Sequence, residues 1–171
     1  MANSGQVDNR PPIYLYTDGA SSGNPGPGGF GVVLKCAGVE KEISGGFACT
    51  TNNRMELLAV ITGLEAIKWP NAQVELFSDS QYVVKAINEG WLENWERKGW
   101  KKVKNPDLWQ RFLPLYRKHR VTLHWIKGHA GHPENERCDK LATAAADGEH
   151  LIADEGLEGP GEDKNTQVSL F

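Results

Sequence analysis

Apolar residues in this chain follow two different spacings, and the order in which these occur limits the folds available to it. Three β-rich segments come first, and after Ala48 helical segments alternate with two further extended segments. Successive strands predict an antiparallel meander, with a turn near Gly38, and the later alternation predicts strands joined through helices. The sequence therefore predicts an α/β fold with a mixed five-stranded sheet and helices packed on it. The expected strands span residues 13–18, 29–38, 39–48, 72–79 and 121–128.

The expected helices are bounded by residues that commonly begin or end helices. Thr51 is a predicted N-cap, Pro133 suits the first turn of a helix, and Gly90 stands just past a helix end. Pro70 should end the first helix, and Pro114 should kink or shorten the fourth. The expected helices span residues 52–69, 80–90, 91–99, 106–120 and 133–148.

Composition predicts one domain with short extensions. With 171 residues, of which 39% are hydrophobic, the chain is long enough for one α/β domain with a buried core. We expect a flexible N-terminus at residues 1–12, a domain at residues 13–147 with a basic protrusion near residues 91–105, and an acidic linker and tail at residues 148–171. Nothing in the sequence demands more than a monomer.

The sequence favours a cytoplasmic protein. No apolar run approaches the ~18 residues needed to cross a bilayer, and the polar stretch MANSGQVDNR lacks the apolar core of a signal peptide. Cys36, Cys49 and Cys138 form neither a CxxC pair nor an even disulfide set. They are therefore expected to be ordinary reduced thiols.

The net charge of −3 conceals an uneven distribution of charge. Residues 147–171 hold seven acidic residues and one lysine, so residues 1–146 carry a net charge of +3. Residues 97–120 contain nine lysines and arginines against one aspartate. Such a run is either a solvated face or, because tryptophans are interleaved with it, a surface for nucleic acid.

Four carboxylates occupy positions that an α/β fold would bring together. Asp18 and Asp79 end predicted strands, Glu56 stands near a helix start, and Asp139 lies among packing residues of the last helix. Strand ends and helix starts line one rim of such a sheet, where ligands usually bind. Carboxylates that converge there repel each other unless a cation lies between them, and Mg2+ prefers oxygen ligands. Two such ions could activate a water and stabilise the leaving oxygen of a phosphodiester.

The motifs YTDGA, TTNNRMEL, SDSQYV and KGHAGHPENERCDKLA, in this order, resemble those of bacterial-type ribonuclease H over about residues 13–146. The resemblance implies an RNase H fold and a metal-dependent endonuclease that cleaves the RNA strand of RNA/DNA hybrids, independent of sequence, leaving 5′-phosphates. It implies Mg2+ or Mn2+ as the cofactor and a role in removing RNA primers and hybrids during replication. It makes Asp18, Glu56, Asp79 and Asp139 the metal ligands, with Asp18 bridging two ions.

His129, in KGHAGH, matches the family's mobile loop histidine, and the resemblance implies a part in proton transfer or product release. Imidazole suits this task because its unperturbed pKa lies near neutrality. A histidine that only caps a turn is the simpler alternative. Together with His132 and Cys138 it would form an incomplete zinc set, which makes zinc the weaker interpretation.

Amide side chains beside the acids suit recognition of an RNA strand through its 2′-hydroxyls, because amides both donate and accept hydrogen bonds. The resemblance supports the same assignment for Asn24, Asn52, Asn53 and Gln81, although Asn24 before a proline is also good turn chemistry. The glycine-rich stretch after Asp18 is expected to be a loop that lets the backbone approach nucleic acid closely.

The stretch WLENWERKGWKKVKN resembles the family's basic protrusion, in which cations attract phosphates and aromatic rings pack on sugars or bases. One alternative is that Trp91 and Trp95, one helical turn apart, share a buried face. Thr51 and Asn105 match family positions that hold a DNA phosphate, whereas Cys49 stands where many relatives carry an arginine. The protrusion residues expected to contact nucleic acid are Trp91, Trp95, Trp100, Lys101, Lys102 and Lys104.

The final residues, QVSLF, form a small apolar cluster after a polar stretch. One hypothesis is that Val168, Leu170 and Phe171 pack back on the domain. The other is that the cluster resembles the peptide by which bacterial replication proteins bind the sliding clamp, with Gln167, Leu170 and Phe171 in contact with the clamp. A flexible tether of this kind would raise the local concentration of the enzyme at its substrate.

Three other functions compete with this interpretation. A catalytically silent hybrid-binding module would need the basic residues but not all four acids. A glycosidase would use two of the carboxylates as an acid and base pair but would give the basic residues no role. A junction resolvase or a domain detached from a reverse transcriptase would share the fold, but the full last motif and the tryptophan-rich basic region favour a stand-alone ribonuclease H.

Overall fold

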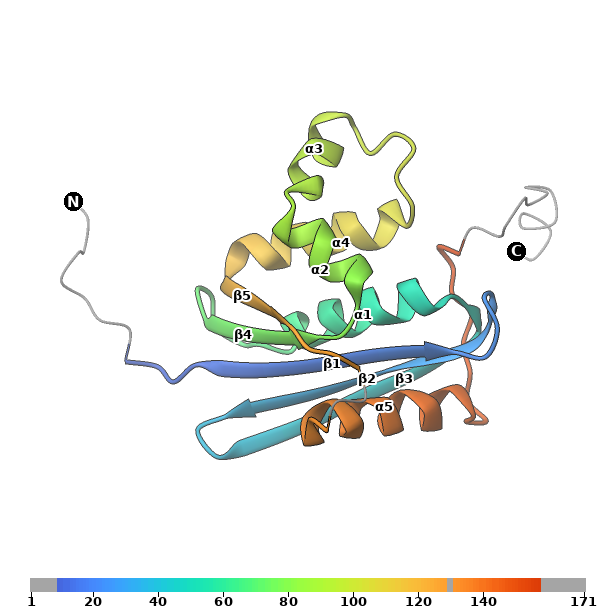
Figure 1. The fold of residues 1–171 in the computed structure, drawn as a ribbon, viewed down its shortest axis with the longest axis horizontal. Coiled ribbons are helices and arrows are strands. Elements are labelled where there is room, and N and C mark those ends of the chain that lie inside the picture. The colour runs from blue at the N-terminus through green and yellow to red at the C-terminus, as the bar shows by residue number, and fades with distance from the viewer. Residues whose placement is uncertain (1–8, 129–130, 158–171) are drawn as a thin grey trace.

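In the computed structural model, which describes residues 9–128 and 131–157, five strands form one mixed sheet in the order β3-β2-β1-β4-β5 (Figure 1). β1 pairs antiparallel with β2 and β2 with β3, whereas β1 and β5 both run parallel to β4. The predicted mixed five-stranded sheet is confirmed. The strands are β1 (Ile13–Ser21), β2 (Gly26–Cys36), β3 (Val39–Thr50), β4 (Gln73–Ser78) and β5 (Arg120–Trp125).

Helices cover both faces of the sheet. α5 lies on one face, against β1, β2 and β3, and the other helices lie on the opposite face (Figure 1). α1 is buried between the sheet and α4, and the core continues into α4 through Trp109 and Phe112, which are fully buried. No helix among the described residues is long and apolar enough to cross a membrane. The helices are α1 (Asn52–Glu65), α2 (Gln81–Asn88), α3 (Trp91–Arg97), α4 (Pro106–Lys118) and α5 (Pro133–Ala146).

The predicted helix starts agree with the structure within one residue, but each helix ends two to four residues before its predicted end. Thr51 caps α1 by accepting a hydrogen bond from the backbone N–H of Arg54, and Gly90 follows α2 with a positive φ of 72°. α1 nevertheless ends at Glu65, before Pro70. α4 continues past Pro114 to Lys118, because Tyr116 in its last turn stacks on Phe112 and packs against the core. Packing therefore outweighs the hydrogen bond that a proline cannot donate.

The glycines after Asp18 serve a different purpose from the one expected. β1 continues to Ser21, and most of the glycines lie in β2 rather than in a loop. A Cβ at Gly29 would lie 2.5 Å from the carbonyl oxygen of Ala142 in α5, and one at Gly31 would lie 2.3 Å from that of Cys138. Gly26 and Gly28, expected in a loop, thus lie in β2, whereas Gly29 and Gly31 lie in a strand as predicted, and their absent side chains let α5 pack directly on the sheet.

Replacing Gly31 by alanine should destabilise the protein by about 3 kcal/mol, as expected for overpacking against backbone that cannot rotate away. The new methyl group would also meet the Cβ of Leu141 at 2.7 Å. Urea unfolding would measure the loss. Gly38→Asn is the matched control, because nothing lies within 4 Å of a Cβ at Gly38 and asparagine tolerates its positive φ of 83°. Equal stability of the two variants would contradict the close approach of α5.

The segment after α5 packs on the domain, in contrast to the linker expected from residue 148 onward. The backbone N–H of Ile152 donates to the carbonyl of Gly46 at 3.2 Å, and that of Ala48 donates to Ile152 at 2.8 Å. Asp154 forms an ion pair with Arg54 in α1. Residues 150–157 are thus attached to β3 and α1, while residues 1–8 and 158–171, expected to be flexible, lie outside the described residues. The three cysteines are unpaired.

Candidate active site

Asp18, Glu56 and Asp79 form a cluster whose carboxylate oxygens lie within 4.8 Å of one another. The register of the sheet explains the first pair. Tyr16 in β1 pairs with Phe77 in the parallel strand β4, so Asp18 and Asp79 each stand two residues further along and meet at the same rim. The sequence predicted this convergence, although Asp18 lies inside β1, opposite Gly31, and not at the strand's end.

Glu56 reaches the cluster because α1 crosses directly over Gly19. A Cβ on Gly19 would lie 2.3 Å from the backbone nitrogen of Glu56, so only glycine permits this approach next to Asp18. Two donors then orient the Glu56 carboxylate. The Asn52 amide donates to it at 3.2 Å, and the Ser80 hydroxyl also forms a hydrogen bond with it.

Burial and mutual repulsion make the cluster electrostatically unfavourable in the absence of a cation. Desolvation, followed by the charge of Asp79, raises the pKa of Asp18 to about 8, against one opposing hydrogen bond from the backbone N–H of Gly19. Desolvation also raises the pKa of Glu56 to about 7, although the hydrogen bond from Ser80 opposes this. Clustered acids whose pKa values are raised by burial are typical of functional sites.

The donor set of the cluster fits a hard divalent cation. Its ligand atoms are all carboxylate oxygens, which suit Mg2+ and Mn2+ and not the sulfur and nitrogen sets typical of zinc. Asp139, on α5, lies outside the group of three, but its charge contributes to the raised pKa of Asp18. Cys138 is fully buried, and burial raises the pKa of its thiol to about 12, so the zinc alternative has no accessible thiolate.

The loop that carries His129 begins beside the carboxylates. His129 itself lies outside the described residues, so its predicted role is not tested by the structure. Gly128, however, is described, and a Cβ there would lie 2.9 Å from a carboxylate oxygen of Asp79. Gly128, the residue before His129 in the sequence, therefore lies adjacent to the metal-binding candidates.

The amides predicted to contact RNA lie around this cluster. The Oδ1 atom of Asn24 accepts a hydrogen bond at 3.1 Å from the backbone N–H of Asn52, which joins the β1–β2 turn to the start of α1. Asn53 is exposed in the first turn of α1, and Gln81 is exposed at the start of α2, two residues after Asp79. The structure thus places all four amides on elements that also position the acids.

The protrusion, residues 91–105, consists of α3 and the loop that follows, and it projects away from the sheet (Figure 1). Its tryptophans differ in accessibility. Trp91 is 39% exposed, whereas Trp95 packs against the buried Trp109 with ring centroids 5.6 Å apart. Trp100 is also partly buried against the core. Trp91 also contacts Trp95, with ring centroids 5.9 Å apart, so the two share a face of α3 that is partly buried at Trp95 and exposed at Trp91. Trp95 and Trp100 chiefly hold the protrusion in place.

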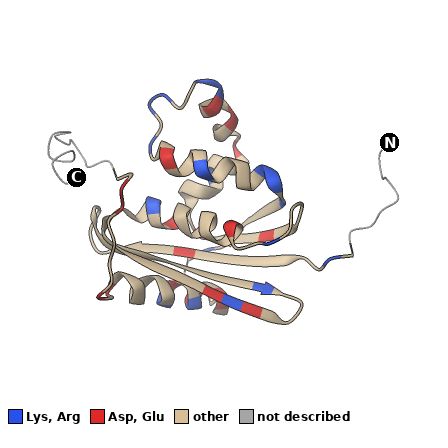
Figure 2. Ribbon diagram, turned by 180° about the vertical axis from the view of Figure 1, so that it is seen from behind, with Lys and Arg blue, Asp and Glu red and all other residues tan. Residues whose placement is uncertain are grey.

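The positive charge of the protrusion is concentrated in its loop, which Figure 2 shows with blue segments and no red ones. Lys101, Lys102 and Lys104 are exposed, and no ion pair is found for them within residues 9–128 and 131–157. By contrast, Arg111 and Arg117 on α4 form bidentate pairs with Glu65 and Glu96. The lysines of the loop are therefore the part of the basic region that remains available to a polyanion.

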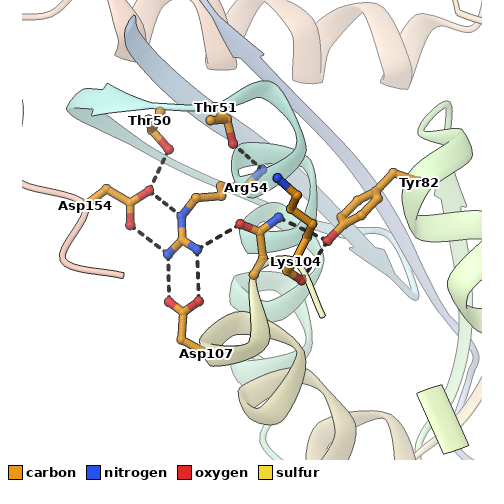
Figure 3. Close-up of polar contacts among 8 residues, drawn as sticks. Thr50, Thr51, Arg54, Tyr82, Lys104, Asp107 and Asp154 are labelled. Atoms are coloured by element: carbon orange, nitrogen blue, oxygen red, sulfur yellow. Dashed lines mark hydrogen bonds and ion pairs between the residues drawn. The ribbon is translucent and has the colours of Figure 1, made fainter. Parts of the chain in front are cut away.

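A buried polar network that the sequence reasoning missed lies beside the expected DNA-phosphate residues. Its centre is Arg54, which contacts Asp107, Asp154 and Asn105 (Figure 3). The sequence did contain a signal for this network. Helical spacing puts Arg54 on the same face of α1 as the apolar residues three, four and seven positions later, Leu57, Leu58 and Ile61. A charged residue at such a position must be paired.

Comparisons with known proteins agree with this site. The family model for RNase H matches residues 10–147. A ribonuclease H from Desulforamulus reducens is 56% identical over 157 residues, which cover 89% of this chain and 98% of the relative. A ribonuclease H from Nitratidesulfovibrio vulgaris is 54% identical over 150 residues, covering 85% of this chain and 96% of the relative.

Two solved structures extend the comparison to three dimensions. LC9-RNase H1, described as a type 1 RNase H with the type 2 active-site motif, has a TM-score of 0.77 and 33% identity, and the match covers 85% of this chain and 76% of the other. LC11-RNase H1, solved in complex with an RNA/DNA hybrid, has a TM-score of 0.58 and 31% identity over 79% of this chain and 96% of the other. Since the family model spans the whole sheet and all the carboxylates at its rim, the chain belongs to the RNase H family.

Proposed function

We propose that this protein is a metal-dependent endoribonuclease that hydrolyses the RNA strand of RNA/DNA hybrids and leaves 5′-phosphate products. The observation that carries the proposal is the cluster of Asp18, Glu56 and Asp79, with carboxylate oxygens within 4.8 Å of one another in a member of the RNase H family. LC11-RNase H1, which has the same fold, is bound to an RNA/DNA hybrid. A silent binding module would have no use for this repulsive cluster.

Asp18, Glu56 and Asp79 would hold Mg2+, or Mn2+, with Asp139 as a further ligand from α5. When bound, two such ions supply an activated water and stabilise the charge on the leaving oxygen. Asp18 is the candidate for bridging both ions, because the charges of the other three carboxylates all act on it. Asn52 and Ser80 orient the Glu56 carboxylate. His129 is proposed to assist proton transfer or product release, because it follows Gly128 beside Asp79.

The surrounding side chains are proposed to distinguish the two strands. Asn24, Asn52, Asn53 and Gln81 flank the acids and would bind 2′-hydroxyls or base edges of the RNA strand. The DNA strand would lie toward the protrusion, where the exposed Trp91 offers a stacking surface. Its phosphates would meet the loop lysines and the pair Thr51 and Asn105. Because most of these contacts go to 2′-hydroxyls, phosphates and ring faces, cleavage should be independent of sequence.

The decisive experiment follows labelled RNA/DNA, RNA/RNA and DNA/DNA duplexes in Mg2+ and in EDTA, for the wild type and for Asp79→Asn. We expect cleavage of RNA in the hybrid alone, only with metal, and about 1,000-fold less in the variant. Asp147→Asn, at an exposed position after α5, is the matched control and should cleave like the wild type. A wild type that binds the hybrid but cleaves nothing in Mg2+ or Mn2+ would be a binding module instead.

We further propose that the enzyme acts as a monomer in the cytoplasm and removes RNA primers and hybrids during replication, with recruitment to the sliding clamp through QVSLF. Three unpaired cysteines suit a reducing compartment. The proposed clamp contacts, Gln167, Leu170 and Phe171, lie outside the described residues, as does the alternative in which the tail packs on the domain. Clamp binding in a pull-down that survives removal of residues 167–171 would contradict the recruitment proposal.

A further inference from the structure

Arg54 is almost completely buried, with 1% of its side chain exposed, yet every guanidinium N–H has an acceptor. Nε and Nη2 donate to the Asp154 carboxylate at 2.7 and 2.9 Å, and Nη1 and Nη2 donate to Asp107 at 2.9 and 2.7 Å (Figure 3). Nη1 also donates to the Oδ1 atom of Asn105 at 3.2 Å. A guanidinium has five N–H groups, so its orientation is fully determined by these three partners.

Asn105 is correspondingly fixed in one orientation of its amide. It occupies the N-cap position of α4, but its side chain makes no cap hydrogen bond there. Instead its Oδ1 accepts from Arg54, and its Nδ2 donates to the Tyr82 hydroxyl at 3.1 Å. That hydroxyl is itself held by the indole N–H of the buried Trp109 at 2.7 Å. The amide thus forgoes a stabilising cap and keeps a second Nδ2–H, for which no acceptor is found in the described part of the chain.

The remaining N–H is what a phosphate requires, since phosphate oxygens accept hydrogen bonds and repel a carbonyl oxygen. A flipped amide would present Oδ1 in its place. We propose that Asp154, through Arg54, is a positioning residue that holds the Asn105 amide with its second Nδ2–H toward a phosphate of the DNA strand. The inference rests on the proposed function and assigns to the segment after α5 a role in hybrid binding.

Asp154 is well placed to control the orientation of Arg54. Its side chain is only 8% exposed, against 42% for Asp107, and the Thr50 hydroxyl donates to its Oδ2 at 2.6 Å. Thr50 precedes the N-cap of α1, so the carboxylate joins the end of β3, the start of α1 and the segment after α5 (Figure 3). Asparagine in its place would keep one acceptor oxygen but set an NH2 group against the other buried N–H of Arg54, so the guanidinium would have to move.

Loss of an acidic charge and loss of a positioning contact should change the KM for the hybrid in opposite directions, and the test uses this difference. Removing an acidic charge should by itself strengthen binding to a polyanion. Asp154→Asn should instead raise the KM for hybrid cleavage in Mg2+ about tenfold and leave kcat within twofold of the wild type. The matched control is Glu155→Gln, the same change of charge at the exposed neighbouring position, which should leave the KM unchanged or lower. Thermal melts of each variant would fix a temperature at which all remain folded.

A double-mutant cycle separates positioning from general disruption. Asn105→Ala should raise the KM about tenfold, and Asp154→Asn should add nothing further to it, because both changes remove the same contact. Additive effects, or an Asp154→Asn KM equal to that of Glu155→Gln, would overturn the positioning proposal while hybrid cleavage by the wild type stood. A wild type that did not cleave the hybrid would overturn the proposed function and this inference together.

Discussion

Replacing Asp18 by asparagine should reduce hybrid cleavage about 1,000-fold and, in metal-free buffer at pH 8, stabilise the protein by about 2 kcal/mol. Both effects have one cause. The carboxylate is 7% exposed and faces Asp79, Asp139 and Glu56, so its charge is costly without a cation. Asparagine keeps an oxygen for the backbone N–H of Gly19, which donates to Asp18 at 2.9 Å, but it carries no charge for a metal ion.

This variant should therefore lose activity and gain stability. Cleavage of a labelled hybrid in Mg2+ would measure the activity, and urea unfolding in EDTA would measure the stability. Asp147→Asn, an exposed acid outside the cluster, should change neither quantity. A variant that lost activity together with stability would indicate that Asp18 supports the fold, and the metal-site assignment would then lose its main support.

The convergence of the acids could be predicted because it depends on local periodicity alone. The apolar part of β1 leads into Asp18, Asp79 follows the parallel strand β4, and Glu56 stands near the capped start of α1. What the periodicity could not show is how closely the layers approach. Gly19 was interpreted as a loop residue because glycine has a strong preference for turns, whereas its use here depends on a helix, α1, whose backbone crosses directly over it.

The attachment of the segment after α5 was missed for a related reason. The sequence around Asp154 is acidic and contains glycine, which favours a linker. Only the position of Arg54 on the apolar face of α1 indicated a distant acidic partner.

The burial of the tryptophans in the protrusion could likewise not be predicted from local spacing. Helical spacing placed Trp91 and Trp95 on one face, but the contact that buries Trp95 comes from Trp109 on another helix.

In EDTA, the free energy of unfolding should fall by several kcal/mol as the pH rises from 5 to 8, since each pH unit over which only the folded state keeps a given proton contributes about 1.4 kcal/mol. The folded pKa values of Asp18, about 8, and Glu56, about 7, lie above the ordinary values of 3.8 and 4.5. The folded state therefore binds protons that the unfolded state has already released. The stabilisation that these protons give the folded state is complete below pH 4 and is lost as the pH rises through the folded pKa values.

Mg2+ should reverse this loss most strongly at pH 8, because binding to the folded state requires ionised carboxylates and adds stability by mass action. Burial lowers the pKa of His119, which makes stability rise toward pH 6.5 and opposes the trend. Asp18→Asn retains His119, so the difference between the two proteins in urea unfolding isolates the cluster. If that difference in stability did not grow between pH 5 and 8, the pKa values of the carboxylates would not be raised. If Mg2+ stabilised both proteins equally, Asp18 would not be a metal ligand.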